Sequence, residues 1–451
     1  MTICEGCLEK NRKIYRLQED IKRLRQKLNY EQKKLKDGYF GSSTPSSKKP
    51  FKSNTQNHNN GGAKKGHKGY GRKSFIENEA DKIIELPIGE KCPHCNSLLE
   101  KKGVDKRSII DKVYKGIEKQ IYNCEKKRCP KCKKYIKAKP VILPKALYGN
   151  QLTSEILVRH YIDMIPMNKI IGMYNLPSSN GCMFEMTHRI AKYLKPAVEL
   201  ITKDYRSEKV KHADETSWRQ DGKSGYSWIF TSDNNIIFEF ADNRSAAIPQ
   251  KILGLDKLNG VLVVDRYAAY NKAPCELQYC FEHLKRTVKD LGQEFLKKQE
   301  VQNFVNTFQP LLVKAIKLRN ENISNKIYYK KARQLKEKIM KIVDSPATHQ
   351  GIKYIQYIFK EKYNRLYHWV NDRDIPADNN KAERDLRPTV IARKISFGSQ
   401  SKKGAATRSV LMTVLQTAKK RLKSGSVVEW FKNVLDTISL NPKIDIYSLF
   451  P

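Results

Sequence analysis

The chain has 451 residues, 39% of them hydrophobic, which is enough for roughly two to four domains and at least one sizeable core. Lys and Arg number 87 against 47 Asp and Glu, and the formal net charge of +40 predicts a polyanionic partner, with nucleic acid the first candidate. An excess of Lys that comes only from the base composition of the genome is the alternative explanation. No apolar run reaches the ~18 residues that cross a bilayer, and the N-terminus lacks a hydrophobic signal core, so we expect a cytoplasmic protein without a membrane partner. In that reducing compartment the ten cysteines are thiols or metal ligands.

The N-terminal segment, residues 1–40, carries an apolar heptad pattern from Leu8 to Leu35 with charged and amide side chains between its members. This spacing is typical of the a/d seam of a coiled coil and predicts a parallel homodimer, whereas a single helix packed on another domain is the alternative. Glu31 occupies one seam position, where a polar side chain weakens the zipper but sets its register. Cys4 and Cys7 have the spacing of metal ligands, yet a single pair does not complete a four-coordinate zinc site.

Residues 41–80 form the next segment, most of which is rich in Ser, Asn, Gly and Lys with almost nothing to bury. This composition predicts a disordered basic linker. Its Lys and His side chains either contact DNA phosphates without reading sequence or leave the segment a plain solvated tether.

Two Cys-x-x-Cys motifs distinguish residues 81–148. Each such turn directs two thiolates at one point, and two turns complete a tetrahedral site, so we predict a zinc-ribbon-like module with a structural Zn²⁺. The four expected ligands are Cys92, Cys95, Cys129 and Cys132. Thiol redox chemistry is the alternative, and His94 and Cys124 lie close by in the sequence as substitute ligands.

Residues 149–205 contain short amphipathic helical segments that Pro and a Ser-Ser-Asn-Gly turn interrupt. Their spacing predicts a small helical bundle of the helix-turn-helix kind. Two interpretations stay open. Either the helix after Gly181 contacts DNA through His188 and Arg189, or the bundle is a packing element that joins the zinc module to the following domain.

The stretch Val261 to Val264 is the centre of the following domain. Its apolar, β-branched-rich residues predict a strand buried on both faces, and Asp265 comes directly after it. Asp214 precedes it within a strand that two further strands follow, and Glu383 comes much later, early in a predicted helix. This order of elements predicts an α/β, ribonuclease H-like fold.

A long helical stretch interrupts this catalytic domain, which we place at residues 206–425. Lys-rich helical periodicity over about 292–371 predicts an all-helical insertion. Three of its aromatic residues stand out: Tyr328, Tyr329 and Trp369. They either stack on an unpaired base or, as is more common at this spacing, form the core of the insertion. Residues 426–451 are a separate C-terminal segment.

Asp214, Asp265 and Glu383 form a candidate catalytic and metal-binding site. Cleavage of a phosphodiester needs a nucleophile that is active at neutral pH and a leaving oxygen whose charge is neutralised. Two Mg²⁺ (or Mn²⁺) ions about 3.5–4 Å apart serve both needs, and they require hard carboxylate ligands. Because the chain has 47 acidic residues, only the placement on strand, strand end and helix singles these three out.

Side chains near these carboxylates are candidate DNA contacts. Arg384 and Arg387 follow Glu383 in its helix, and their guanidinium groups suit phosphate oxygens, although an exposed ion pair of Glu383 with Arg387 is the alternative. His283 either positions the substrate or is a core histidine. Because successive side chains of a strand point to opposite faces, the side chain of Glu215 should point away from the face that carries Asp214. We therefore expect no catalytic role for Glu215.

With these residues the chain resembles the transposases of the insertion sequence 66 family, which are of the DDE type. The likeness is carried by several motifs in a fixed order: the coiled coil, SSTPSSKKP, GGAKKGHKGYGR, the double Cys-x-x-Cys module, HADETSW, VVDRYAAY, CFEHLKR, NNKAERDLRP and GSQSKKGAATRSVLMTVLQTAKK. The family pattern places its catalytic triad on Asp214, Asp265 and Glu383.

The resemblance implies a DNA transposase that cuts both ends of its insertion sequence and joins the 3′-hydroxyls to target DNA by two-metal-ion phosphoryl transfer. The implied partners are the double-stranded DNA of the ends and of the target, a second copy of the chain, and accessory transposition proteins where the element requires them. The implied place of action is the bacterial nucleoid. Two alternatives stay open: a purely hydrolytic nuclease, and a catalytically inactive DNA-binding regulator.

Overall fold

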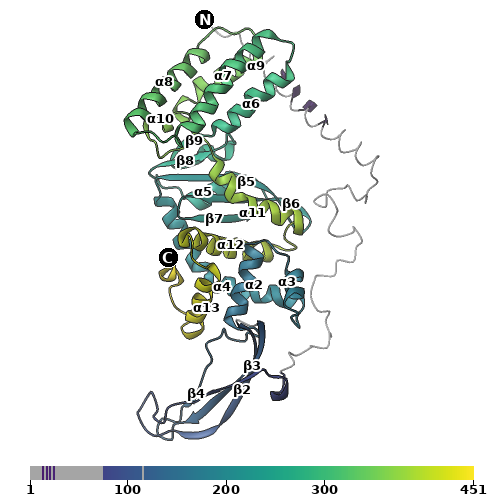
Figure 1. Ribbon diagram of the computed structural model, residues 1–451, viewed down its shortest axis with the longest axis vertical. Helices are drawn as coiled ribbons and strands as arrows, with labels where there is room; N and C mark the ends of the chain where they lie inside the picture. The colour runs from purple at the N-terminus through teal and green to yellow at the C-terminus, as the bar shows by residue number, and fades with distance from the viewer. Residues whose placement is uncertain (1–12, 15–16, 19, 22–23, 26–74, 114–115) are drawn as a thin grey trace. The chain divides into compact units, whose positions relative to one another are not determined.

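The structure, a computed structural model, describes residues 13–14, 17–18, 20–21, 24–25, 75–113 and 116–451 (Figure 1). The described residues from 75 onward belong to one compact unit, Asn59–Pro451, and those before 26 belong to another, Met1–His58. Four predicted seam positions of the coiled coil are helical and about half exposed: Ile14, Leu17, Ile21 and Leu24. The other seam positions, Cys4, Cys7 and the linker up to residue 74 lie outside the described residues, so the coiled coil stays a prediction.

The cysteine-containing module is a small four-stranded sheet, and a short 3-10 helix, η2 (Glu77–Glu79), precedes it. Its strands are β1 (Lys82–Leu86), β2 (Glu100–Val113), β3 (Gly116–Arg128) and β4 (Tyr135–Lys137). β2 and β3 form a long antiparallel hairpin, while β1 and β4 pair with β3. The buried aliphatic side chains of these strands are few: Ile109, Ile110 and Ile121. A core this small needs a further constraint, which the cysteines are placed to supply.

Three helices form the predicted bundle: α2 (Asn150–Tyr161), α3 (Met167–Met173) and α4 (Asn180–Ser207). The Ser179 hydroxyl caps α4 by accepting from the backbone N–H of Cys182 at 3.3 Å. α4 is longer than the short segments that the sequence predicts, because it continues through Pro196. Burial of one face along its whole length, from Met183 to Tyr205, stabilises the continuous helix.

The central sheet has five strands in the order β7-β6-β5-β8-β9. The first three in the chain form the antiparallel meander that the sequence predicts: β5 (Val210–Gln220), β6 (Lys223–Thr231) and β7 (Ile236–Ala241). The last two run parallel to β5: β8 (Val261–Val264) and β9 (Glu276–Tyr279). The connections contain α5 (Ala247–Leu253) and η3 (Ala268–Lys272). All four residues of β8 are buried, as their apolar run indicates.

Helices occupy the stretch in which the sequence predicts a helical insertion (Figure 1). α6 (Phe281–Glu294) begins before this stretch and ends in it. The stretch itself contains α7 (Gln299–Leu318), α8 (Asn325–Val343), α9 (Gln350–Glu361), η4 (Tyr363–Arg365) and α10 (His368–Asn371). Tyr328 and Trp369 are each 1% exposed, and the Tyr328 hydroxyl donates to the Trp369 carbonyl at 2.7 Å. Both are therefore core residues of the insertion, whereas Tyr329 is half-buried.

Three helices and a short 3-10 helix complete the chain: α11 (Asn380–Ser396), α12 (Lys402–Leu422), α13 (Val427–Leu440) and η5 (Ile446–Leu449). α11 packs against β5 and β6, α12 packs against β7 and α4, and α13 packs against α2. The predicted C-terminal segment thus contributes to the core of the helical bundle. None of the helices in the described part of the chain is both long and apolar enough to span a membrane.

Gly260 precedes β8 in a left-handed backbone conformation, with φ at +83°. A Cβ atom there would lie 2.2 Å from the carbonyl oxygen of Lys209, which accepts the first hydrogen bond of β8. Gly260→Ala is therefore expected to lower the free energy of unfolding by ~3 kcal/mol or more, since it adds a backbone clash to an unfavourable φ. Chemical denaturation measures this. The control is Gly172→Ala in α3, where no atom lies within 4 Å of the added carbon and stability should change by no more than ~1 kcal/mol. Equal stability of both variants would contradict the close approach of residue 260 to the Lys209 carbonyl.

His160 of α2 joins the bundle to α12 through a buried polar contact. Its Nδ1 donates to the Ile165 carbonyl at 2.8 Å, and its Nε2 accepts from the Arg408 guanidinium at 3.3 Å. The buried guanidinium of Arg408 also lies 5.3 Å from the ring centroids of Tyr161 and Trp218. Burial, followed by the charge of Arg408, lowers the pKa of His160 to about 3. The fold therefore requires the neutral imidazole.

Acid is expected to destabilise the protein through His160. The pKa of this imidazole is lower in the folded than in the unfolded chain, so its contribution to stability is complete above about pH 6.5 and is lost as the pH falls towards 3. In that window the free energy of unfolding should fall by up to about 1.4 kcal/mol per pH unit. His160→Gln, which keeps a donor and an acceptor, should flatten this dependence in denaturation curves at several pH values. A slope equal to that of the wild type would show that His160 is not the acid-sensitive group.

Candidate active site

Asp214 and Asp265 are neighbours because β5 and β8 pair in parallel. In this register His212 pairs with Val263. Asp214 lies two residues after His212 on β5, and Asp265 lies two residues after Val263, just past the end of β8. Glu383 lies in the first turn of α11, which packs against β5. The structure thus brings the three carboxylates together from a strand, a strand end and a helix.

The charges of these carboxylates act on one another. Burial, followed by the negative charges of Glu215, Asp265 and Glu383, raises the pKa of Asp214 to about 7. Two backbone N–H groups bind the aspartates: that of Glu215 donates to Asp214 at 2.9 Å, and that of Tyr267 donates to Asp265 at 2.8 Å. Among the described residues, no Lys or Arg nitrogen lies within ion-pair distance of the three carboxylates. No ion pair with Lys or Arg within the described residues therefore compensates their negative charge.

This donor set fits hard divalent cations. Mg²⁺ and Mn²⁺ prefer carboxylate oxygens, and a cation would compensate the charge that raises the pKa of Asp214. In the described part of the chain, a group of cysteines is the only set of possible metal ligands whose ligand atoms all lie within 4.8 Å of one another. The oxygens of the three carboxylates are therefore spaced more widely than this.

His283 lies beside the carboxylates. It is in the first turn of α6, which begins directly after β9, and its Nε2 is 4.0 Å from Oε1 of Glu383. Its Nδ1 is buried and has no hydrogen-bond partner within the described residues. The structure therefore brings His283 to the candidate site, and its contact with DNA stays a prediction.

Glu215 follows Asp214 on β5, and its side chain is satisfied by other residues. It is 2% exposed, and its oxygens accept from the Arg244 guanidinium, with Nε at 2.7 Å, and from the Tyr270 hydroxyl. Glu215 is therefore already paired within the protein, and its exclusion from the metal ligands stays a prediction. Sequence reasoning did not single out Arg244 or Tyr270, whose only signal is their place in the short motifs ADNRS and DRYAAY.

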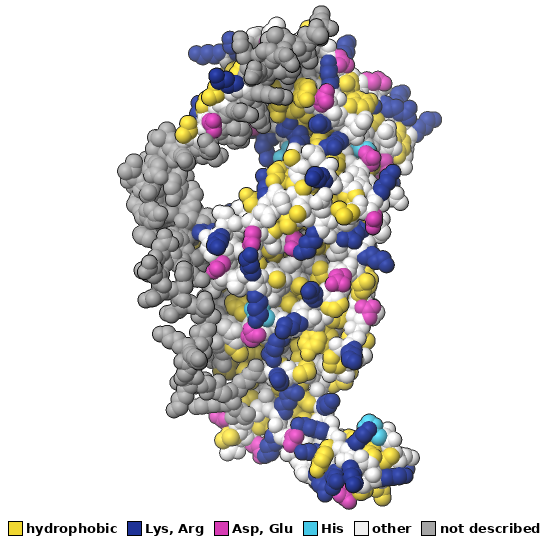
Figure 2. Space-filling model, turned by 180° about the vertical axis from the view of Figure 1, so that it is seen from behind, with side chains coloured by type: hydrophobic (Ala, Val, Ile, Leu, Met, Phe, Trp, Pro, Cys, Tyr) yellow, Lys and Arg dark blue, Asp and Glu magenta, His cyan; other side chains and the backbone are white. Residues whose placement is uncertain are grey.

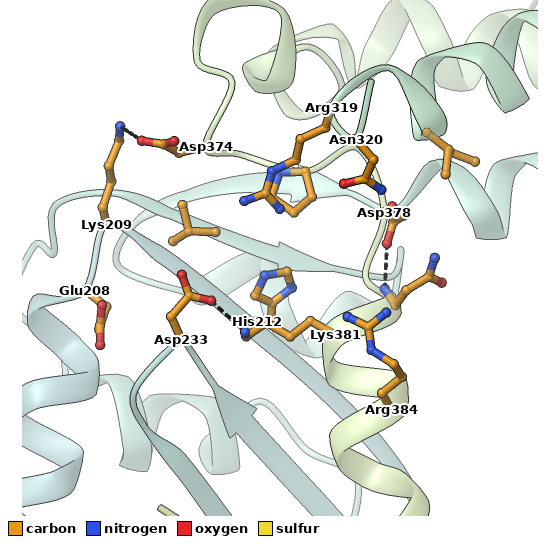
Figure 3. A pocket seen from close by; sticks show the side chains of 14 residues that line it. Glu208, Lys209, His212, Asp233, Arg319, Asn320, Asp374, Asp378, Lys381 and Arg384 are labelled. Carbon is orange, nitrogen blue, oxygen red and sulfur yellow. Dashed lines mark hydrogen bonds and ion pairs between the residues drawn. The ribbon is translucent and has the colours of Figure 1, made fainter. Parts of the chain in front are cut away.

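Arg384 and Arg387 are exposed on α11, and neither forms an ion pair with Glu383 in the described structure. Arg384 lines a neighbouring cavity of about 300 Å³, together with Arg319 at the end of α7 (Figure 3). The lysines in its wall are paired with acids: Lys381 with Asp233 and Lys209 with Asp374. The three carboxylates do not line this cavity, and the contact of Arg384 with DNA stays a prediction.

His188 and Arg189 lie on α4 and are partly buried. Nδ1 of His188 is 2.6 Å from the Thr407 hydroxyl, and Arg189 donates to the Lys145 carbonyl at 3.2 Å. These contacts favour the packing interpretation of the bundle. The structure does not bring either residue to the carboxylates.

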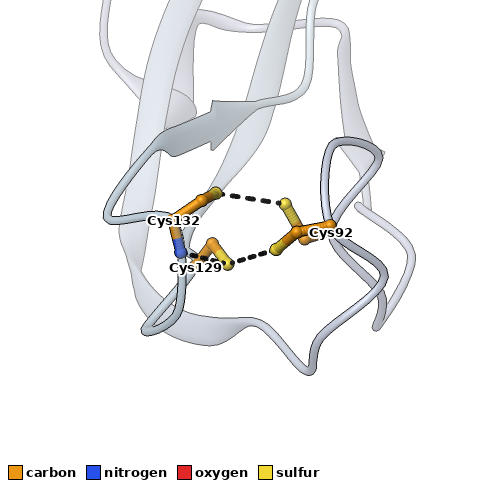
Figure 4. Close-up of side chains that lie close together, drawn as sticks. Cys92, Cys129 and Cys132 are labelled. Atoms are coloured by element: carbon orange, nitrogen blue, oxygen red, sulfur yellow. Dashed lines mark hydrogen bonds between the residues drawn. The ribbon is translucent and has the colours of Figure 1, made fainter.

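The cysteines of the two motifs converge on one point (Figure 4). Sulfur atoms are 3.6 Å and 3.3 Å apart in the pairs Cys92–Cys132 and Cys95–Cys129. All four sulfurs lie within 4.8 Å of one another, and ligands at ~2.3 Å from a tetrahedral zinc are about 3.8 Å apart, so the group fits Zn²⁺. The proposed substitutes do not belong to the cluster, and His94 is exposed.

The fold and these sites define a mixed α/β protein with a group of carboxylates and a four-cysteine cluster that fits a metal ion. The chain belongs to the Transposase IS66 family, whose model matches residues 145–407. The match includes the helical bundle, the central sheet, the insertion and all three carboxylates. The cysteine cluster lies outside it.

Proteins of Sinorhizobium fredii are also similar to the chain. Uncharacterized protein y4jD is 22% identical over 396 residues, which cover 79% of this chain and 76% of that protein. Uncharacterized protein y4hP is 22% identical over 415 residues, which cover 82% and 74%. These matches span more of the chain than the family model does, and the names of the two proteins assign no activity.

Proposed function

We propose that the protein is a DDE transposase that cleaves the ends of its insertion sequence and joins the 3′-hydroxyls to target DNA by two-metal-ion phosphoryl transfer. The observation that carries this proposal is the mutual proximity of Asp214, Asp265 and Glu383 within the residues that match the transposase family. Membership of the family supports the role of a transposase, and the carboxylates support the chemistry.

The topology of the central sheet supports a ribonuclease H-like core. A three-stranded antiparallel meander continues into two parallel strands, in the order β7-β6-β5-β8-β9. The acids lie on the middle strand, at the end of its parallel neighbour and on the helix that packs over them. In open α/β sheets, ends of adjacent parallel strands are where binding sites form.

In the proposed mechanism Asp214, Asp265 and Glu383 would together hold the divalent cations. Bound Mg²⁺ or Mn²⁺ supplies a nucleophile that is active at neutral pH and neutralises charge on the leaving oxygen. The protein orients its ligands, since the backbone N–H groups that bind Asp214 and Asp265 occupy one oxygen of each. His283, next to Glu383, positions the scissile phosphate. The released 3′-hydroxyl then loses its proton and attacks a phosphodiester of target DNA, so that a new P–O bond forms while the 3′-oxygen of the target strand leaves and takes up a proton.

Positive charge on the described surface supports binding of double-stranded DNA. On the face drawn in Figure 2, Lys and Arg side chains are spread over the whole described surface. Residues 292–371 contain 16 Lys and Arg against 6 Asp and Glu. Tyr354 and Tyr357 of α9 are 54% and 58% exposed, and exposed rings among basic residues suit nucleic acid. Arg384 and Arg387, which form no ion pair within the described residues, follow Glu383 on α11 and are the proposed phosphate contacts there.

The remaining parts serve assembly in this proposal. The exposed apolar seam positions of the N-terminal helix support a coiled-coil homodimer, which would hold two DNA ends together. The cysteine cluster binds a structural Zn²⁺. The protein acts in the cytoplasm, at the nucleoid, with accessory transposition proteins where its element requires them.

End cleavage and strand transfer test the proposal. The protein is incubated with labelled DNA that carries the ends of its insertion sequence, a target plasmid, and Mg²⁺ or Mn²⁺. We expect 3′-hydroxyl ends and joined products, and EDTA should abolish both. A hydrolytic nuclease would cleave without joining, and a regulator would bind without cleaving. Absence of cleavage with either metal would contradict the proposal.

A further inference from the structure

A partly buried polar cluster lies beside the candidate active site. We call it the Glu215 cluster, and its members are Glu215, Arg244, Tyr267 and Tyr270. They come from three separate segments: β5, the loop after β7, and the turn and 3-10 helix after β8. None of them is a proposed metal ligand or a proposed DNA contact.

Glu215 occupies the centre of this cluster. One of its oxygens accepts from Nε of Arg244 at 2.7 Å and also from its Nη2, while the other accepts from the hydroxyl of Tyr270. The Glu215 side chain is 2% exposed, and Tyr270 is fully buried. A buried carboxylate is costly unless it is paired, so these contacts favour one arrangement of the three segments.

Tyr267 extends the cluster to Asp265. Its ring centroid lies 3.7 Å from the guanidinium carbon of Arg244, and its hydroxyl donates to the Arg244 carbonyl. Its backbone N–H donates to one oxygen of Asp265 at 2.8 Å. The segment from Asp265 to Tyr270 is thus held at both ends, by Tyr270 on Glu215 and by Tyr267 on Arg244.

We infer that Glu215 is a positioning residue, which through Arg244 and Tyr270 holds the turn after β8 so that Asp265 presents its second oxygen to a divalent cation. That oxygen accepts no hydrogen bond within the described residues, whereas the first is fixed by the Tyr267 N–H. This role depends on the proposed function of Asp265 as a metal ligand. Groups that orient metal ligands in this way typically change metal affinity about 10–100-fold when they are replaced.

Glu215→Gln tests this role, because the amide keeps the size of the side chain but removes the charge that pairs with Arg244. Binding of Mn²⁺ to the full-length protein without DNA, followed by electron paramagnetic resonance, should weaken about 10–100-fold. The half-saturating Mg²⁺ concentration for end cleavage should rise in the same proportion. Tyr270→Phe removes one hydrogen bond and should act in the same direction to a smaller extent.

The matched control is Glu239→Gln. Glu239 lies on β7 and pairs with Lys251 at 2.6 Å, so the substitution removes an ion pair from the same sheet outside the cluster. Its Mn²⁺ affinity should equal that of the wild type. Arg244→Lys keeps a positive charge beside Glu215 and should retain more Mn²⁺ affinity than Arg244→Gln.

Three outcomes would overturn the role of Glu215. The first is wild-type Mn²⁺ affinity in folded Glu215→Gln and Tyr270→Phe. The second is a lower thermal unfolding midpoint together with an unchanged affinity for Mn²⁺, measured at a temperature well below that midpoint. A cluster that only stabilises the fold would give this result. The third is a wild-type protein that neither binds Mn²⁺ nor cleaves DNA, which would overturn the proposed function as well. Failure of the positioning role alone is therefore recognised by an active wild type and unaffected variants.

Discussion

Replacement of Asp265 by Asn is expected to lower the rate of Mg²⁺-dependent end cleavage at least ~10³-fold, which corresponds to about 4 kcal/mol of lost transition-state stabilisation. Asn keeps the shape of the side chain but loses the charge that binds a divalent cation. Asp214→Asn and Glu383→Gln should cause losses of similar size, because each removes one member of the same group. Single-turnover cleavage of labelled DNA ends measures the rates.

Binding of DNA by these variants should remain close to that of the wild type when it is measured without metal. The control is Asp256→Asn in the exposed loop before β8, which should cleave at the wild-type rate. Cleavage by Asp265→Asn at the wild-type rate would remove Asp265 from the catalytic site. Loss of activity in Asp256→Asn would show instead that removal of a negative charge outside the three carboxylates also lowers cleavage, so that the assay is not specific for the triad.

Removal of zinc is expected to unfold the cysteine-containing module and to leave the central sheet folded. The module buries few aliphatic side chains, and the four cysteine sulfurs that draw its turns together need a metal to hold them. Cys129→Ser should therefore reduce bound zinc from about one ion per chain to none. It should also expose the Lys-rich hairpin of β2 and β3 to trypsin. Metal analysis and limited proteolysis measure the two effects, and a strong chelator should reproduce them in the wild type.

Cys182→Ser provides the matched control, since this cysteine is exposed on α4 and does not belong to the cluster. It should keep its zinc and the protease resistance of the wild type. If Cys129→Ser kept both properties, the cysteine cluster would not be a structural metal site.

Much of the fold could be predicted from local patterns. The apolar run of β8, the meander of β5 to β7 and the helical periodicity of the insertion each depend on residues close together in the sequence. Boundaries were less predictable, because packing between distant segments decides them. α4, for example, continues through Pro196 as one long helix instead of the short segments that the sequence predicts.

The part of the candidate site that could be predicted is the set of carboxylates, because their metal-binding chemistry and the order of the elements that carry them point to the same residues. Asp214, Asp265 and Glu383 were singled out because they occupy a strand, a strand end and a helix, and parallel pairing of β5 with β8 brings the two aspartates together. His283 could not be assigned, because its distance from Glu383 depends on where α6 begins relative to α11. Arg244 and Tyr270 were missed, because their contacts with Glu215 join residues 29 and 55 positions apart.

The sequence by itself determined which segments are strands and helices, where paired thiols and carboxylates stand, and to which family the chain is similar. Only the tertiary structure decided which of two adjacent acids is paired with other side chains and which lies among further carboxylates. Asp214 and Glu215 are neighbours on one strand, yet Glu215 is paired with Arg244 and Tyr270, whereas Asp214 faces other carboxylates. The physical reason is that the charge state of a buried acid depends on the groups that folding brings around it, and these groups come from distant parts of the chain.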